Sequence, residues 1–253
     1  MKTTGNTVLI TGGATGIGFS LAQAFSEAGN QVIICGRRED KLQEAKAKLP
    51  QIETRTCDVA NPDDRQALFE WITSNFPGLN ILVNNAGIQR QVDFKQGTLD
   101  LFNRENEIAA NLEAPIHLSA LLITHFLNQP EAAIVNITSG LAFTPLAIVP
   151  IYCATKAALH SFSLSLRHQL SDTSIKVFEV APPIVDTELD KGAREERGQE
   201  DRGIKPEEVA QATLAGLVNN QFEIVIGLAN KLRLDSEKMF KIINGWLEQG
   251  LPF

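Results

Sequence analysis

Short segments rich in apolar and β-branched residues alternate with longer amphipathic segments along this chain. The short segments predict seven strands, at 7–10, 31–35, 53–57, 80–83, 133–137, 176–180 and 223–226. The longer segments predict helices at 17–28, 39–48, 63–75, 99–127, 152–170, 206–219 and 236–249, the fourth of them kinked near Pro115. Strands that alternate with helices favour a parallel sheet with right-handed crossovers and helices on both faces.

The composition is that of an ordinary globular protein, with 43% hydrophobic and 21% charged residues. A net charge of -7 makes nucleic acid and anionic membrane surfaces poor partners, because both attract clustered Lys and Arg. The longest apolar stretch, 118–127, is far shorter than the ~20 residues that a membrane span requires. The widely spaced Cys35, Cys57 and Cys153 indicate neither a disulfide framework nor a zinc site. We therefore expect no nucleic-acid or membrane partner, no metal, and a cytoplasmic location.

A glycine-rich turn, residues 11–18, joins the first predicted strand to the first predicted helix. Glycines at 12, 16 and 18 allow the backbone to turn sharply and to approach a pyrophosphate closely. The helix that follows would point its free N–H groups and its positive dipole end at that anion. The turn alone is also compatible with a tight connection that binds nothing. In this context it indicates a doubly wound, Rossmann-type α/β fold with seven parallel strands, formed by residues 1–253 as one domain.

The residues after the second strand, Gly36, Arg37 and Arg38, bear on the choice of cofactor. An Asp or Glu at this place would bind the ribose 2′-OH of NAD, and this chain has none. Each guanidinium instead offers a 2′-phosphate charge-assisted hydrogen bonds of about 1.5–3 kcal/mol. We therefore expect NADP as the preferred cofactor, with NAD as the alternative. The competing interpretation is that both arginines are solvated residues at a strand end.

Tyr152 and Lys156 stand four residues apart at the start of a predicted helix, so their side chains share one helical face. A free Tyr has a pKa near 10, too high for acid/base work at neutral pH. An ammonium about 4 Å away, at an effective dielectric of about 20, would favour the phenolate by roughly 4 kcal/mol. That is about three pKa units, so the pair suits proton transfer near pH 7.

Several of these segments together resemble the short-chain dehydrogenase/reductase family, from residue 7 to about residue 190. The resemblance lies in the G-x-x-x-G-x-G spacing of the turn, in Asp58 after the third strand, and in the N-N-A-G sequence at 84–87. It implies reversible hydride transfer between a nicotinamide and a carbonyl or alcohol. Ser139–Phe143, the helix at 152–170 and the pair Pro182-Pro183 most resemble the DltE-type oxidoreductases within it.

The resemblance also implies four catalytic residues with distinct roles. Tyr152 would exchange a proton with the substrate oxygen, and Ser139 would hydrogen-bond that oxygen. Lys156 would lower the Tyr pKa and hold the nicotinamide ribose. Asn111 would position a water in the proton relay. A non-catalytic NAD(P)-binding sensor or scaffold on the same fold is the alternative function, and the complete set of four argues against it. Epimerases and dehydratases of this type are usually longer.

The expected cofactor-binding residues come from the turn, the strand ends and the segment after the sixth strand. They are Gly12, Thr15, Gly16, Ile17, Gly18, Arg37, Arg38, Asp58, Val59, Asn85, Ala86, Gly87, Tyr152, Lys156, Pro182, Val185 and Thr187. Two positions depart from the family. Thr15 stands where many NADP-using relatives have a basic residue. Pro183 stands where a Gly is usual, and proline fixes φ and removes a donor.

The substrate side of the predicted site is apolar. Leu141, Phe143, Leu146, Ile148 and Val149 are expected at the pocket edge, which favours a modest, fairly apolar carbonyl or alcohol. The charged segment at 188–205 is expected to be a mobile substrate loop. Relatives usually pair through the two long helices, so the resemblance implies a homodimer or a homotetramer.

Overall fold

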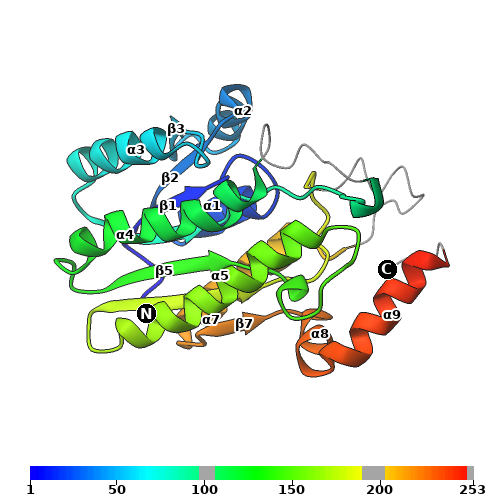
Figure 1. Cartoon of the computed structure of the whole chain (residues 1–253). Coiled ribbons are helices and arrows are strands. Elements are labelled where there is room, and N and C mark those ends of the chain that lie inside the picture. Colours follow the sequence, from blue (N-terminus) through cyan, green and yellow to red (C-terminus); the bar gives the residue numbers. More distant parts are fainter. Residues whose placement is uncertain (97–105, 190–202, 250–253) are drawn as a thin grey trace.

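A parallel sheet of seven strands lies between two layers of helices in the computed structural model, which describes residues 1–96, 106–189 and 203–249 (Figure 1). The strands are β1 (Thr7–Thr11), β2 (Gln31–Gly36), β3 (Glu53–Thr56), β4 (Leu79–Asn84), β5 (Ala132–Ile137), β6 (Ile175–Ala181) and β7 (Glu223–Val225). Their order across the sheet is β3-β2-β1-β4-β5-β6-β7, and all neighbouring pairs are parallel. The predicted fold class is therefore confirmed.

Two apolar cores form because successive side chains of a strand point to opposite faces of the sheet. The longer helices are α1 (Gly16–Glu27), α2 (Glu39–Lys48), α3 (Pro62–Asn75), α4 (Ala114–Phe126), α5 (Pro150–Gln169) and α7 (Pro206–Val218). Val8 and Ile10 of β1 belong to the core beneath α1, α2 and α7. Leu9, between them, belongs to the core beneath α3, α4 and α5. β1 and β5 are buried along their whole length, as expected of parallel strands covered on both faces.

The predicted helix at 99–127 differs from the structure in its first half. Residues 97–105 lie outside the described part, and the helical path enters α4 through a π-helical turn, Ala109–Glu113. A π turn inserts an extra residue and changes the direction in which side chains leave the helix. It lies directly before Pro115, where the sequence predicts a kink. α5 begins two residues before the predicted start because Pro150 is accommodated in the first turn.

Two helices complete the chain beyond β7. α9 (Ser236–Glu248) matches the predicted helix at 236–249, whose expected end at Gly250 lies outside the described residues. α8 (Ala229–Leu234) was not predicted. Figure 1 shows α8 and α9 beyond the end of α5 that begins at Pro150, away from the main helical layers. Among the described residues, no helix is both long and apolar enough to cross a membrane.

Candidate active site

A cleft of about 480 Å³ opens at the carboxyl ends of the central strands. All the residues expected to bind the cofactor line it, including the glycine turn and Thr187. Ser139, Tyr152 and Lys156 line the same cleft. Of the four residues expected to be catalytic, Asn111 alone does not. The sequence thus identified groups that the fold brings together from the ends of six strands, β1 to β6.

The glycine turn between β1 and α1 forms one wall of the cleft and needs its glycines. Gly12 and Gly16 have φ of +63° and +53°, a region that side chains disfavour. A Cβ on Gly18 would lie 2.2 Å from the carbonyl oxygen of Gly12, so the helix and the turn could not approach as they do. The turn leaves the N-terminus of α1 open toward the cleft. This backbone cradle fits a pyrophosphate, because a helix N-terminus stabilises an anion.

Thr11, which the sequence analysis assigned no role, fixes the turn to the adjacent strand end. Its Oγ1 accepts hydrogen bonds from the backbone N–H of Asn85 and Ala86, both at 3.0 Å. The side-chain Nδ2 of Asn85 donates in return to the carbonyl oxygens of Thr11 and Gly12, at 2.9 and 3.1 Å. These bonds hold the two sides of the cleft together. The signal available in the sequence was a Thr directly before the first glycine.

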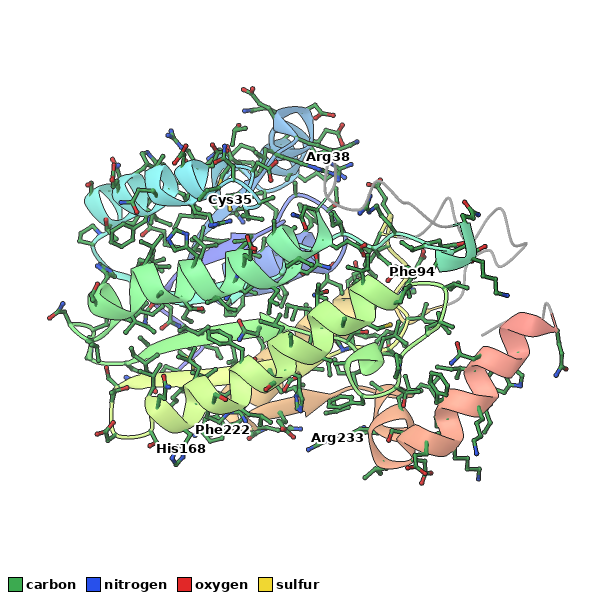
Figure 2. The ribbon with its side chains drawn as sticks, viewed as in Figure 1. Cys35, Arg38, Phe94, His168, Phe222 and Arg233 are labelled. Atoms are coloured by element: carbon green, nitrogen blue, oxygen red, sulfur yellow. The ribbon has the colours of Figure 1, made fainter. Side chains whose placement is uncertain are left out.

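The end of the cleft near β2 and β3 carries both arginines. The guanidinium of Arg38 lies 3.4 Å from Thr15 Oγ1 and 3.4 Å from a carboxylate oxygen of Glu188 (Figure 2). Its side chain is half exposed, so this ion pair contributes little to stability. Asp58 accepts a hydrogen bond from the N–H of Ala60 at 3.0 Å, which turns the chain after β3 into the cleft. Glu188, as a partner of Arg38, was not anticipated.

Tyr152 and Lys156 lie in the first turns of α5 with both side chains buried. The Lys156 Nζ is 5.6 Å from the centroid of the Tyr152 ring, and it donates a 2.8 Å hydrogen bond to the carbonyl oxygen of Ile137. Burial lowers the pKa of Lys156 to about 8. An ammonium beside the phenol ring is therefore the majority form at neutral pH. The helical spacing placed the two groups as expected.

Ser139 lies at the end of β5, where its Oγ accepts a hydrogen bond from the N–H of Leu141 at 3.1 Å. The bond caps a short 3-10 turn, Gly140–Ala142, and fixes the direction of the hydroxyl. In this contact Oγ is the acceptor, so the hydroxyl proton remains available for a second hydrogen bond. The neighbouring Gly140 donates its N–H to Pro182 O at 2.9 Å, which joins the turn to the segment after β6.

Asn111 is fully buried behind the cleft, in the π turn before α4. Its amide accepts from the N–H of Ile88 and donates to the carbonyl oxygen of Ile88, both at 2.9 Å. It also donates to Thr155 Oγ1 at 3.1 Å, and that hydroxyl donates to Tyr152 O at 2.7 Å. Asn111 thus connects the segment after β4 to the turn of α5 that carries the tyrosine.

The apolar wall of the cleft differs from the prediction at one residue. Leu141, Leu146, Ile148 and Val149 line the cleft, but Phe143 does not. The Phe143 ring instead packs edge-on against His160, with centroids 5.0 Å apart, and beneath the guanidinium of Arg233. The assignment of Phe143 to the pocket was wrong because its place depends on partners from distant elements.

Two cleft residues that the sequence did not suggest come from the region of α8. Leu228 and Leu232 both line the cleft.

Of the predicted loop at 188–205, residues 190–202 lie outside the described part. Glu188 and Leu189 line the cleft, and Ile204 forms a parallel bridge with Val185.

Comparison with known proteins agrees with this geometry. A model of the family described as short chain dehydrogenase matches residues 6–198. The chain is 56% identical over 248 residues to the uncharacterized oxidoreductase DltE of Bacillus subtilis (strain 168), covering 96% of this chain and 98% of that protein. The resemblance to the DltE-type oxidoreductases is thereby confirmed.

Solved structures with the same fold include cofactor complexes. A short-chain dehydrogenase from Sphingobium yanoikuyae in complex with NADPH is 28% identical, with a TM-score of 0.80 and coverage of 96% of this chain and 95% of that one. A short chain dehydrogenase/reductase from Burkholderia phymatum in complex with NAD has a TM-score of 0.83, covering 99% and 97% of the two chains. At 19% identity, the latter shows the shared fold alone.

The buried Lys156 predicts a stability effect that depends on pH. Its pKa falls from an ordinary 10.5 to about 8 on folding, so below pH 8 the charged amine costs the folded protein roughly 3 kcal/mol. Lys156→Met removes this cost, together with a hydrogen bond worth about 1 kcal/mol. We expect the ligand-free variant to exceed wild type in free energy of unfolding by roughly 1–3 kcal/mol at pH 7.

The difference should shrink as pH rises from 8 to 10.5, because the wild-type amine then loses its proton in the folded state but keeps it in the unfolded state. Urea denaturation of both proteins at several pH values measures it. A variant that is less stable by the same amount at every pH would contradict the expectation.

Proposed function

Because the chain belongs to the short-chain dehydrogenase family, we propose that this oxidoreductase uses a nicotinamide dinucleotide to interconvert a carbonyl and an alcohol, with Tyr152 as the acid/base. The observation that carries the proposal is the convergence of Ser139, Tyr152 and Lys156 on the cleft that the glycine turn opens. A binding cradle and a proton-transfer group thus face one space. Sensing a cofactor would require only the cradle.

In the proposed reaction, the bound nicotinamide supplies or accepts the hydride. The chain's own residues manage the oxygen of the substrate. Tyr152 gives its phenol proton to that oxygen during reduction and takes it back during oxidation. Ser139 donates its hydroxyl proton to the same oxygen, since Oγ is the acceptor in its contact with Leu141 N–H and the proton remains available. The Lys156 ammonium favours the phenolate form of the tyrosine, because an opposite charge nearby stabilises it.

We propose NADP as the preferred cofactor. Arg37 and Arg38 both line the cleft beside Gly36, and residues 36–38, at the end of β2, include no Asp or Glu that could bind a 2′-hydroxyl. Arg38 also reaches Thr15, the position where many NADP-using relatives have a basic residue. The Arg38 guanidinium therefore lies beside Thr15, where those relatives have their basic residue. The related Sphingobium yanoikuyae protein was solved with NADPH.

The proposed substrate is a modest, fairly apolar aldehyde, ketone or alcohol. Several leucines, Ile148 and Val149 line the cleft. Apolar walls with a few polar groups bind such molecules by removing their surface from water.

We also propose a cytoplasmic location, which the three buried, unbridged cysteines support.

Tyr152→Phe tests the proposed chemistry. Turnover of apolar aldehydes and ketones, followed by absorbance of the reduced cofactor, should fall by at least ~10²-fold, the usual yield of general acid/base catalysis. Cofactor affinity should stay nearly unchanged. Tyr152 is the sole tyrosine of the chain, so the phenolate absorbance of wild type, with the variant as blank, also reports its pKa directly. Wild-type turnover in the variant would overturn the role of Tyr152, whereas a sensor would turn over nothing in either form.

Arg37→Ala and Arg38→Ala test the choice of cofactor. Loss of one charge-assisted contact to the 2′-phosphate should weaken NADP binding roughly tenfold to a hundredfold, and NAD binding should change little. Added salt should reduce the preference, because the site is partly exposed. Arg55→Ala, which removes an exposed guanidinium from β3 outside the cleft, is the control. Equal losses for the two cofactors would identify the arginines as solvated residues.

The proposed assembly is a homodimer or homotetramer formed through α4 and α5. These helices expose Ile116 and Leu164, with 38% and 41% of their surface accessible. Light scattering at micromolar concentration should give two or four times the chain mass of 27.6 kDa. Leu164→Arg should lower that mass, since an unpaired charge at an interface core is strongly unfavourable. A monomeric wild type would refute the assembly.

A further inference from the structure

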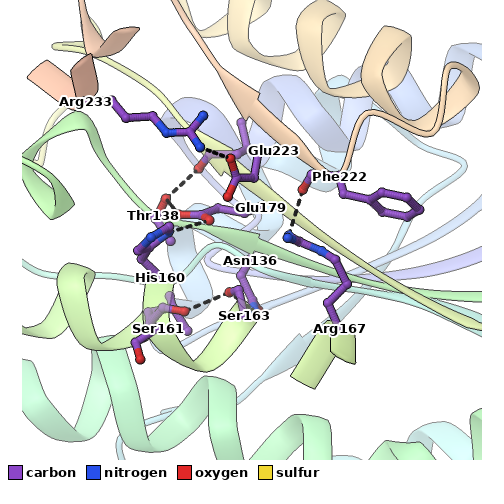
Figure 3. Close-up of polar contacts among 12 residues, drawn as sticks. Asn136, Thr138, His160, Ser161, Ser163, Arg167, Glu179, Phe222, Glu223 and Arg233 are labelled. Atoms are coloured by element: carbon purple, nitrogen blue, oxygen red, sulfur yellow. Dashed lines mark hydrogen bonds and ion pairs between the residues drawn. The ribbon is translucent and has the colours of Figure 1, made fainter. Parts of the chain in front are cut away.

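Three hydrogen-bonded polar side chains, those of Thr138, Glu179 and His160, adjoin Ser139 (Figure 3). Of the three, only Thr138 also lines the cleft. The chain of hydrogen bonds begins at Thr138, whose backbone N–H donates to Val180 O at 2.8 Å. The Thr138 hydroxyl donates to Glu179 Oε1 at 2.7 Å. Glu179 is only 1% exposed, so its carboxylate has lost nearly all contact with water. A buried carboxylate is costly unless its oxygens are hydrogen-bonded and its charge is balanced.

His160 supplies the other partner of this carboxylate. Its Nδ1 lies 2.8 Å from Glu179 Oε2. A carboxylate accepts hydrogen bonds, so Nδ1 carries the proton in this contact. His160 stands on α5 one turn after Lys156, and the same helix therefore carries the residues that line the cleft and the group that holds Glu179.

His160 also contacts the other side of the Ser139 turn. Its ring packs edge-on against Phe143, the residue that ends the 3-10 turn after Ser139. Thr138 precedes Ser139 directly. His160 is thus connected to the residue before Ser139 through Glu179, and it touches the residue after the turn itself. A shift of the imidazole would act on both sides of the serine.

The charges around His160 come from three elements. Glu179 lies on β6, Glu223 on β7 and Arg233 on α8, and Arg233 pairs with Glu223. The hydrogen bond that His160 donates to Glu179 raises the pKa of His160, while burial and, more weakly, Arg233 oppose the rise. Two carboxylates therefore face a guanidinium and an imidazole that readily becomes a cation.

The same side chains have the spacing of a metal site, because ligand atoms of His160, Glu179 and Glu223 lie within 4.8 Å of one another. The existing partners argue against that use. Both carboxylate oxygens of Glu179 are hydrogen-bonded, and Glu223 forms an ion pair with Arg233. A metal ion would have to displace a guanidinium and a threonine hydroxyl. The arrangement is already satisfied as a hydrogen-bonded chain.

We propose that His160, Glu179 and Thr138 form a positioning chain that holds Ser139 in place for proton transfer. This inference rests on the proposed function, in which Ser139 binds the substrate oxygen. His160 is a positioning residue and touches neither substrate nor cofactor. Without it, Glu179 is left buried with one partner, and the carboxylate must take up a proton or move toward water. Either change weakens its hold on Thr138 and loosens the turn that follows.

The test compares His160→Leu, His160→Asn and Thr138→Val with wild type. His160→Leu removes the donor, and Thr138→Val removes the hydroxyl while keeping the shape of the side chain. Each should lower kcat roughly tenfold to a hundredfold, the effect of misplacing a reacting group by about 1 Å. The NADP(H) dissociation constant should not change. His160→Asn keeps an N–H donor close to the position of Nδ1 and should restore most of kcat.

The Thr138→Val/His160→Leu double variant distinguishes one positioning chain from two independent structural effects. If Thr138 and His160 act through one chain, the combined loss in kcat should not exceed the larger single loss, because the second change has nothing left to break. His168→Leu, at an exposed site near the far end of α5, is the matched control and should leave kcat unchanged (Figure 2). Additive losses, or a folded His160→Leu with wild-type kcat, would overturn the proposal.

Amide hydrogen exchange over residues 139–144 tests the inference without turnover. Exchange there should accelerate in His160→Leu and Thr138→Val, but not in His168→Leu. Unchanged exchange would refute the positioning chain even in an active enzyme. Conversely, a wild type that turns over no carbonyl compound would refute the proposed function, while accelerated exchange would still support the chain. A rise in the wild-type melting temperature on adding ZnCl₂, absent from His160→Leu, would overturn the proposal in favour of a metal site.

Discussion

The pairing of β1 with β4 is the contact on which the site depends. The strand order reverses there, since β2 and β3 extend the sheet on one side of β1 and β4 to β7 extend it on the other. The chain leaves β1 for α1 on one face, and the path after β4 leads to α4 on the opposite face. A crevice between the two strand ends follows from this divergence. Thr11 and Asn85 bridge it by hydrogen bonds, so its two walls keep a fixed separation.

α5 transmits that fixed geometry to the reacting groups. One helix of 20 residues carries Tyr152 and Lys156 into the cleft, and Ser163 on it accepts a 2.8 Å hydrogen bond from Asn136 of β5. Asn136 in turn accepts from Asn84 of β4 at 2.8 Å. These polar groups are buried, and buried hydrogen bonds are strongly directional because leaving one unmade is costly. The helix therefore cannot slide along the sheet without breaking them, which suits the proposed role of Tyr152 as a precisely placed proton donor.

The sequence predicted those parts of the molecule that local chemistry determines. Short segments rich in apolar and β-branched residues predicted the strands. The glycines of the turn predicted the cradle, because a side chain disfavours the φ of Gly12 and a Cβ cannot fit at the contact of Gly18. The π turn at Asn111 was not predicted, since its helical periodicity is broken by contacts with Ile88 and Thr155.

α8 was missed for a related reason. Six residues are too few for a helix to be stable alone. The segment is held by tertiary contacts, such as the 2.7 Å bond from the Thr144 hydroxyl to Leu232 O. Phe143 was misplaced because its partners, His160 and Arg233, come from α5 and α8. Each error falls where a long-range contact overrides a local pattern.

The parts of the cleft that the sequence predicted are those proposed to carry the reaction, and the parts that it missed belong to the wall proposed to face the substrate. The acid/base pair and the glycine turn stand on α5 and β1, which the buried sheet holds rigidly. The apolar wall comes from the 141–149 segment, which follows β5, and from Leu228 and Leu232 near α8, which follows the edge strand β7. Substitutions in that wall would alter the shape of the pocket without disturbing the strand ends, so under the proposed function related chains could share Tyr152 and Lys156 and accept different substrates. The motifs of the first group predict the proposed reaction class, whereas the shape of the pocket beside them depends on the packing of α8 against the turn after Ser139, which the sequence did not predict.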